Sequence, residues 1–270
     1  MRRYLHGLTV WMMVGLFVLP VVWMVATAFK SPGEILNAGA RLWPEQLSLS
    51  AFERLLAGEF PLLIGNTLMI ALMATGLSLL VSFFSAYALV RYRFPAKLDR
   101  AFLLAVLVIK MMPPIVVATP LYSLINQLGL LNTKLGLVLC YQVYTLPFCI
   151  WMLLGFIRDI PLEIEEAAAM DGAHLFKRLG FVVFPLCAPG LVATAIFSII
   201  LGWNEFLFSL LFIHTPDKFT IPLYLANFMT EDGTAWGELM AAGLVSSLPM
   251  LALAGYMQRF LLRGFSLGLK

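Results

Sequence analysis

The chain has 270 residues, of which 61% are hydrophobic and only 12% are charged, and its formal net charge is +3. A soluble domain of this length carries about 25% charged residues, so the composition excludes an ordinary soluble fold. The apolar residues come in runs long enough to cross about 30 Å of hydrocarbon as a helix. The sequence therefore predicts an integral membrane protein.

The apolar runs predict six transmembrane helices in a single domain over residues 1–270. They are too long and too continuous for barrel strands, which alternate polar and apolar residues over about ten positions. Helices also satisfy their own backbone hydrogen bonds, as lipid requires, so the predicted fold class is all-α. The expected spans are Leu8–Phe29, Thr67–Val90, Ala101–Tyr122, Leu135–Ile157, Pro189–Ile213 and Leu239–Leu262.

The first span has some features of a secretory signal. Arg2 and Arg3 precede it, and Ala26-Thr27-Ala28 resembles a cleavage site. Its apolar stretch is longer than the usual signal core of about 7–15 residues, so we expect an uncleaved helix.

The basic residues predict the orientation. With the N-terminus inside, 12 of the 18 Lys and Arg residues lie on the cytoplasmic side, 5 lie outside, and Lys110 falls within a span. This bias follows the positive-inside rule. Both termini are therefore expected in the cytoplasm, with residues 30–62 forming an extracytoplasmic loop and residues 158–182 the longest cytoplasmic one.

Lys110 is a charged residue inside the third expected span. A charge at mid-bilayer costs about 2.5–3.5 kcal/mol on insertion scales, so such residues usually face a cavity or a partner. The alternative is that a neighbouring helix neutralises it or that it reaches an interface. Because Met111-Met112-Pro113-Pro114 follows directly, we expect the helix to kink or break there.

The loop at 158–182 contains the signals of two short helices. Asp159 and Pro161 are typical of a helix start, and three glutamates follow at the positive end of the helix dipole. Alanines 167–169 give a smooth face, Gly172 ends the run, and a second short helix carries Lys177 and Arg178. We expect a compact helix–turn–helix, which serves either as a connector or as a docking element.

This loop resembles the EAA motif of ATP-binding-cassette (ABC) importer permeases. The matching residues are Glu166-Ala167-Ala168, then Asp171-Gly172, and nine residues later Val182-Val183-Phe184-Pro185, where the family has Ile-x-Leu-Pro. Further stretches resemble the carbohydrate-uptake branch, of the maltose-transporter type. They are Phe29–Glu34, Asn66-Thr67, Arg93-Phe94-Pro95, Leu128–Thr133, Trp203–Phe206 and Gln258-Arg259-Phe260. The tail Gly264–Lys270 departs from the usual ending of relatives, which puts tail contacts with an ATPase in doubt.

The resemblance implies a type I importer permease in a bacterial or archaeal cytoplasmic membrane. It implies a second homologous permease, two ATPase subunits and an extracytoplasmic solute-binding protein as partners, with Glu166, Ala167, Ala168, Asp171 and Gly172 coupling to the ATPase. ATP and Mg are expected on those ATPase subunits, because this chain has no phosphate-binding G-x-x-x-x-G-K-[ST] loop. Membrane lipid surrounds the chain, and we expect no cofactor, metal, nucleic-acid partner or enzyme activity in it.

Span five carries Trp203, Asn204 and Glu205, which offer a stacking face and hydrogen-bonding groups to a sugar. We take them, with Lys110, as candidate pathway residues; pairing of Lys110 with Glu205 stays open, because their depths differ by about 10 Å. A group in span four is more typical of packing than of sugar contact: Tyr141, Gln142, Tyr144 and Trp151. The cysteines at 140, 149 and 187 lack metal-ligand spacing and are expected to be small buried hydrophobes.

Three other readings remain. Within the family, the solute could be glycerol phosphate, a polyol, a peptide or another solute instead of a sugar. An ion-coupled secondary transporter would need coupling sites near the midplane, for which Glu205 alone is thin support. A membrane-embedded enzyme would need a clustered constellation, whereas His6, His174 and His214 are scattered.

Overall fold

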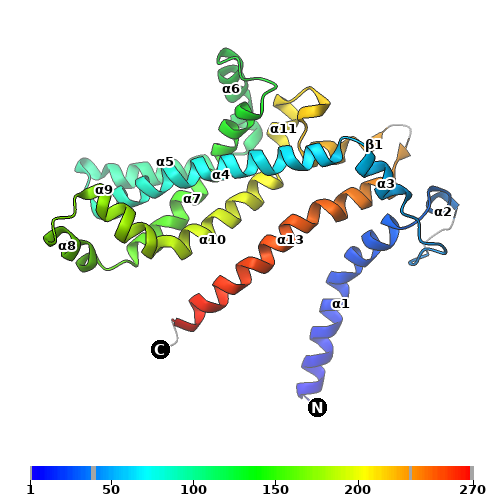
Figure 1. The fold of residues 1–270 in the computed structure, drawn as a ribbon, viewed down its shortest axis with the longest axis horizontal. Coiled ribbons are helices and arrows are strands. Elements are labelled where there is room, and N and C mark those ends of the chain that lie inside the picture. The colour runs from blue at the N-terminus through cyan, green and yellow to red at the C-terminus, as the bar shows by residue number, and fades with distance from the viewer. Residues whose placement is uncertain (1, 38–40, 231–232, 268–270) are drawn as a thin grey trace.

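The computed structural model describes residues 2–37, 41–230 and 233–267, and most of these are helical (Figure 1). The α-helices are α1 Arg2–Ala28, α2 Pro32–Asn37, α3 Ser50–Ala57, α4 Phe60–Arg91, α5 Leu98–Met111, α6 Pro114–Gln127, α7 Lys134–Arg158, α8 Leu162–Met170, α9 Leu175–Arg178, α10 Phe184–Trp203, α11 Leu207–Phe212, α12 Ile221–Ala226 and α13 Trp236–Leu267. Short 3₁₀ turns lie at Pro95–Lys97 and Pro216–Lys218, and a π-helical segment at Leu179–Val183. Residues 268–270, part of the departing tail, lie outside the described residues.

The helical fold class is confirmed. Five described helices are long and apolar enough to span a membrane, or six if one bent pair counts as a single span. The sequence did not predict a small antiparallel pair, β1 Met229–Thr230 with β2 Gly233–Thr234, beside the start of α13.

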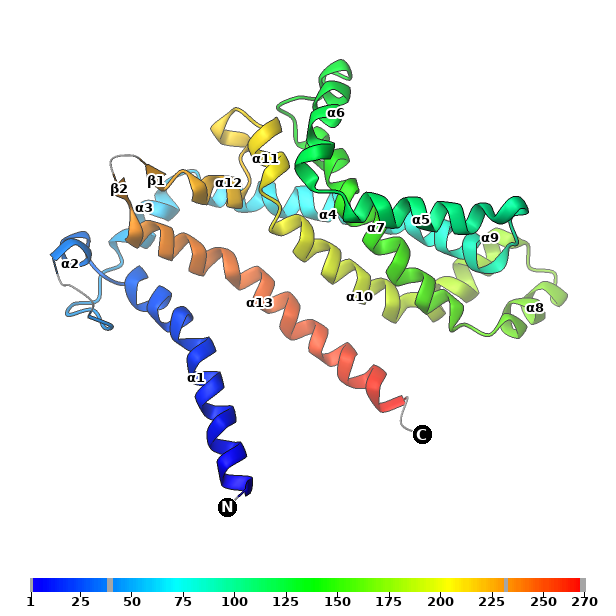
Figure 2. The same cartoon turned by 180° about the vertical axis from the view of Figure 1, so that it is seen from behind.

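Two of the expected spans are not continuous helices. The third is split into α5 and α6, which meet at 102°; the expected break is confirmed, and it follows from Pro113 and Pro114, which cannot continue the helical hydrogen bonding. The expected continuous helix to Ile213 was wrong, because α10 ends at Trp203 and the chain restarts as α11 at Leu207. Figure 2 shows α6 and α11 standing side by side, across the direction of the long helices.

The helices α4, α7 and α10 pack along one another as the centre of the molecule (Figures 1 and 2). Small residues allow this close approach, as is common between membrane helices. A Cβ atom at Gly202 would lie 3.4 Å from the Ala71 Cα atom, and one at Gly190 only 2.2 Å from Cγ of Phe156. The sequence pattern of small residues therefore sets the spacing of the central helices.

Hydroxyl and amide groups join these central helices within the apolar core. Ser78 on α4 donates to Gln142 Oε1 on α7 over 2.7 Å, and Thr75 on α4 donates to the hydroxyl of Ser198 on α10 over 2.9 Å. Such interhelical bonds fix the rotation of one helix against the next. Gln142, a weak candidate for solute contact, thus serves packing.

Helix α1 is mostly exposed. Its side chains from 6 to 20 lie on the surface, and large apolar ones such as Trp11 and Phe17 are 74% and 80% exposed. It approaches α13 near its C-terminal end and diverges from it toward its N-terminus (Figure 1). An apolar helix exposed in this way needs lipid or another membrane protein around it.

Candidate functional site

The helix–turn–helix expected at 158–182 is present at one end of the central bundle (Figure 1). Pro161 precedes α8, Asp171 follows it, and α9 continues through the π-helical segment into α10. Because α9 continues into the span, any displacement of this helix pair acts directly on α10. We call residues 158–182 the coupling loop, after the role that the sequence resemblance implies for them.

The turn between α8 and α9 depends on Gly172. Its φ is +81°, a left-handed conformation that disfavours side chains. The Ala173 N–H donates to the carbonyl of Ala168, and the Gly172 N–H to that of Ala169, each over 3.0 Å. This pattern is a Schellman motif. The expectation that Gly172 forms the turn is therefore confirmed. The reason is the backbone angle and not a lack of space, because no atom beyond its own residue and its two chain neighbours lies within 4 Å of where a Cβ atom would stand.

The outer surface of the coupling loop is apolar as well as acidic. Glu166 and Ala167 are exposed and Ala168 is half-buried. Met170 and Phe176 are exposed to 89% and 73%. Large apolar side chains exposed together on a short polar loop are typical of a surface that another protein covers.

Glu165, in contrast, is buried, with 1% of its surface exposed. Its carboxylate accepts hydrogen bonds from Nε of Arg91 over 2.8 Å and from the Tyr87 hydroxyl over 2.9 Å. The Arg91 guanidinium also donates to the carbonyls of Ile157 and Ile160 over 3.3 and 2.8 Å. Sequence reasoning assigned Glu165 only to the helix dipole and missed this pairing of α8 with the end of α4.

The break between α10 and α11 contains Glu205, which is 7% exposed. Its carboxylate accepts the backbone N–H groups of Phe208 over 2.9 Å and of Ser209 over 3.3 Å. These N–H groups belong to the first turn of α11 and have no helical partner of their own. Glu205 therefore caps α11.

A hollow of about 420 Å³ lies beside this break, lined by Asn204, Glu205 and Tyr144 among others. Trp203 is not among its lining residues and is buried in the core, with 4% exposed. Of the polar and aromatic group in span four, Tyr144 alone lines this hollow. The structure thus brings together Asn204, Glu205 and Tyr144 and separates Trp203 from them.

Lys110 does not pair with Glu205. Its Nζ atom lies 5.7 Å from the centre of the Phe148 ring, a cation–π contact, and its side chain is exposed at the end of α5. Phe148 lies one helical turn beyond Tyr144 on α7, and Lys110 is not among the residues that line the hollow.

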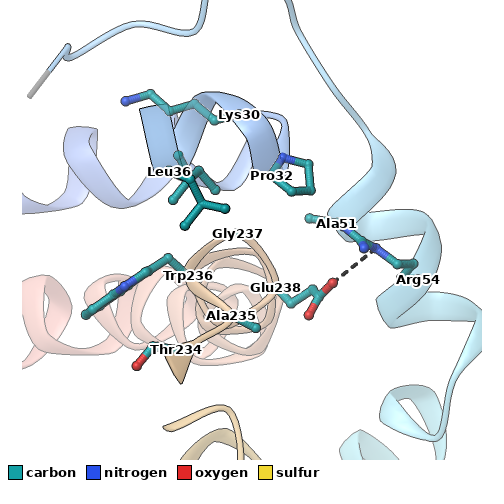
Figure 3. A pocket seen from close by; sticks show the side chains of 11 residues that line it. Lys30, Pro32, Leu36, Ala51, Arg54, Thr234, Ala235, Trp236, Gly237 and Glu238 are labelled. Carbon is teal, nitrogen blue, oxygen red and sulfur yellow. Dashed lines mark ion pairs between the residues drawn. The ribbon is translucent and has the colours of Figure 1, made fainter. Parts of the chain in front are cut away.

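At the end of the molecule opposite the coupling loop lies a smaller pocket of about 250 Å³, between α2, α3 and the start of α13 (Figure 3). Arg54 and Glu238 form an ion pair of 3.0 Å across it. Lys30 also lines it and donates to the carbonyl of Arg41 over 2.5 Å, while its Nζ lies over the Trp23 ring. The ion pair joins α3 to α13, and the two Lys30 contacts link the backbone at Arg41 to the end of α1.

The cysteines are unpaired and buried. The described residues contain no group of three or more His, Cys, Asp or Glu arranged to hold a metal ion.

These features define a polytopic helical membrane protein with an ordered helix pair inserted between two spans. Residues 78–267, more than two-thirds of the chain, match the family "Binding-protein-dependent transport system inner membrane component". The chain belongs to this family: it is a multi-pass inner-membrane permease subunit of a binding-protein-dependent ABC importer.

Named relatives extend over nearly the whole chain. The diacetylchitobiose uptake system permease protein DasC of Streptomyces coelicolor is 34% identical, over 99% of this chain and 99% of DasC. The trehalose/maltose permease MalG of Thermococcus litoralis is 32% identical, over 92% and 90% of the two chains. The trehalose permease SugB of Mycobacterium tuberculosis is also 32% identical, over 95% and 93%.

Solved structures agree on the fold. A chain of a bacterial ABC transporter involved in import of the acidic polysaccharide alginate superposes with a TM-score of 0.81 over 95% of both chains, at 20% identity. A chain of the alginate transporter in complex with an alginate-bound periplasmic protein gives a TM-score of 0.67, covering 95% of this chain and 91% of that one.

Proposed function

We propose that this permease imports a sugar or oligosaccharide. The main support for this proposal is the similarity of the chain, along nearly its full length, to permeases named for diacetylchitobiose, trehalose and maltose. The hollow at the α10–α11 break supports this, because Asn204, Glu205 and Tyr144 offer the hydrogen-bonding groups that sugar hydroxyls use.

The hollow also favours a neutral solute over glycerol phosphate. Its ionisable lining side chains are the Glu205 carboxylate and the Tyr144 phenol, and a carboxylate repels a phosphate group. An ion-coupled secondary transporter finds little support, since the Glu205 carboxylate already accepts two backbone N–H groups.

The proposed assembly contains a second homologous permease, two ATPase subunits and an extracytoplasmic solute-binding protein. The ATPases bind ATP and Mg and dock on the coupling loop through Glu166, Ala167, Ala168, Asp171 and Gly172. The exposed Met170 and Phe176 support this docking, because a protein surface would shield them from water. The distribution of Lys and Arg supports a cytoplasmic location for the coupling loop and both termini.

The test is expression of the chain with its neighbouring transport genes, followed by purification without cross-linking. We expect ATPase subunits and a second permease to co-purify, and proteoliposomes of the complex with its binding protein to take up radiolabelled diacetylchitobiose, maltose or trehalose when ATP is present inside. Uptake of glycerol 3-phosphate with no uptake of these sugars would contradict the proposal, as would uptake driven by an ion gradient without ATP.

A further inference from the structure

Helix α4 connects the coupling loop to the far end of the molecule (Figures 1 and 2). It is a single helix of 32 residues. The other four described helices that pass as spans on their own contain an internal proline. In α4 the proline lies in the first turn, at Pro61, where it does not interrupt helical hydrogen bonds. Helix α4 therefore lacks the proline kink sites of its neighbours.

One end of α4 is fixed to the coupling loop. Tyr87 and Arg91, one turn apart, both bind the buried carboxylate of Glu165 on α8. A carboxylate removed from water needs such partners, and taking one away leaves an uncompensated buried charge. A displacement of α8 must therefore carry the end of α4 with it or break these bonds.

The other end of α4 is fixed to the segment that follows α11. The Asn66 amide donates to the carbonyls of Asp217 and Phe219 over 2.8 and 3.3 Å, and the Thr67 hydroxyl accepts the backbone N–H of Ile221 over 2.9 Å. Both side chains are buried, with 2% and 1% exposed. This segment continues from the α11 turn that Glu205 caps, beside the hollow.

We propose that α4 is a rigid rod that transmits movement of the coupling loop to residues 213–221, and that Arg91, Tyr87 and Glu165 are its positioning residues. The proposal rests on the proposed docking of an ATPase at α8. The distance from Arg91 to Asn66 along the helix is about 38 Å, at about 1.5 Å per residue. A nucleotide-driven displacement at one face of the membrane thereby moves a loop at the other.

The test places a cysteine at Asp217, whose side chain is exposed and whose backbone carbonyl alone binds Asn66. The native cysteines are buried, so a membrane-impermeant maleimide should label the new position selectively. In the complete complex with its ATPase subunits, in proteoliposomes, we expect the labelling rate to differ between the nucleotide-free state and ATP plus vanadate. Equal rates in the two states would overturn the proposal.

Glu165→Gln should remove this difference or reduce it by about fivefold or more, the range of energetic coupling between distant sites. Tyr87→Phe, which deletes one hydroxyl, provides a milder variant where Glu165→Gln assembles poorly. Glu163→Gln is the matched control, because Glu163 is an exposed carboxylate on the same helix. The proposal would be overturned if the labelling response to nucleotide keeps its wild-type size in the assembled Glu165→Gln and Tyr87→Phe complexes. It would also be overturned if Glu163→Gln reduces that response as much as Glu165→Gln does.

The contacts of Asn66, at the other end of α4, provide an independent test of the proposal. Asn66→Ala should also reduce the response, and the Glu165→Gln, Asn66→Ala double variant should lose no more than the worse single variant, because both changes interrupt one path. Fully additive losses would contradict a single rod.

A cross-link between Glu166→Cys and an ATPase cysteine separates this proposal from the docking on which it rests. If the cross-link forms but the labelling response survives every variant, the rod is wrong and the docking stands. If the cross-link never forms in the otherwise wild-type complex, the proposed docking itself fails.

Discussion

Gly172→Val is expected to leave the permease in the membrane while abolishing the coupling of ATP hydrolysis to uptake. The left-handed φ of +81° costs a residue with a side chain about 1–2 kcal/mol, and valine, being β-branched, is among the least suited to it. Valine should therefore open the Schellman turn and change the angle between α8 and α9. The measurement is sugar uptake per ATP hydrolysed in proteoliposomes of the complex.

Gly172→Asn is the matched control, since asparagine tolerates the left-handed conformation better than other residues with side chains. It should retain most of the coupling, with Gly172→Ala in between. Wild-type uptake and substrate-stimulated ATPase activity in Gly172→Val would show that the turn geometry has no part in coupling.

Glu205→Ala should destabilise the assembled complex. It leaves the buried N–H groups of Phe208 and Ser209 without their acceptor, and an unsatisfied buried group costs about 1–3 kcal/mol. Less intact complex on gel filtration and a lower unfolding temperature are the expected readouts. A complex as stable as the wild type would refute the capping role.

Glu205→Gln separates capping from a role in the pathway. Glutamine keeps one acceptor oxygen, which can still cap Phe208, but loses the negative charge beside the hollow. We expect assembly close to that of the wild type with an altered uptake rate or solute preference. Unchanged kinetics on every transported sugar would confine Glu205 to capping.

Much of the fold follows from local sequence. The apolar runs predicted the spans, Pro113 and Pro114 predicted the bend between α5 and α6, and Gly172 predicted the turn of the coupling loop. Each is a property of neighbouring residues, and local backbone chemistry is enough to predict it.

Other features depend on contacts between distant segments. Arg91 and Glu165 are 74 positions apart, and each has the local pattern of a solvated charge near a membrane surface, so their pairing was not predictable. The end of α10 at Trp203 was missed for a related reason. Asn204 and Glu205 were interpreted as pathway residues inside a span, whereas the Glu205 side chain stabilises a break in the helix by accepting hydrogen bonds from the backbone that follows it. The sequence left a pairing of Glu205 with Lys110 open, whereas in the structure the Glu205 carboxylate accepts backbone N–H groups.

The most direct test of the central claim, that this permease is driven by separate ATPase subunits through its coupling loop, is the cross-linking of Glu166→Cys. We predict a disulfide with a cysteine introduced into the docking cleft of the ATPase, with a yield that changes when ATP is bound, and no reaction with an impermeant thiol reagent added outside intact cells. Labelling of this cysteine from outside, together with no cross-link in any nucleotide state, would contradict the account.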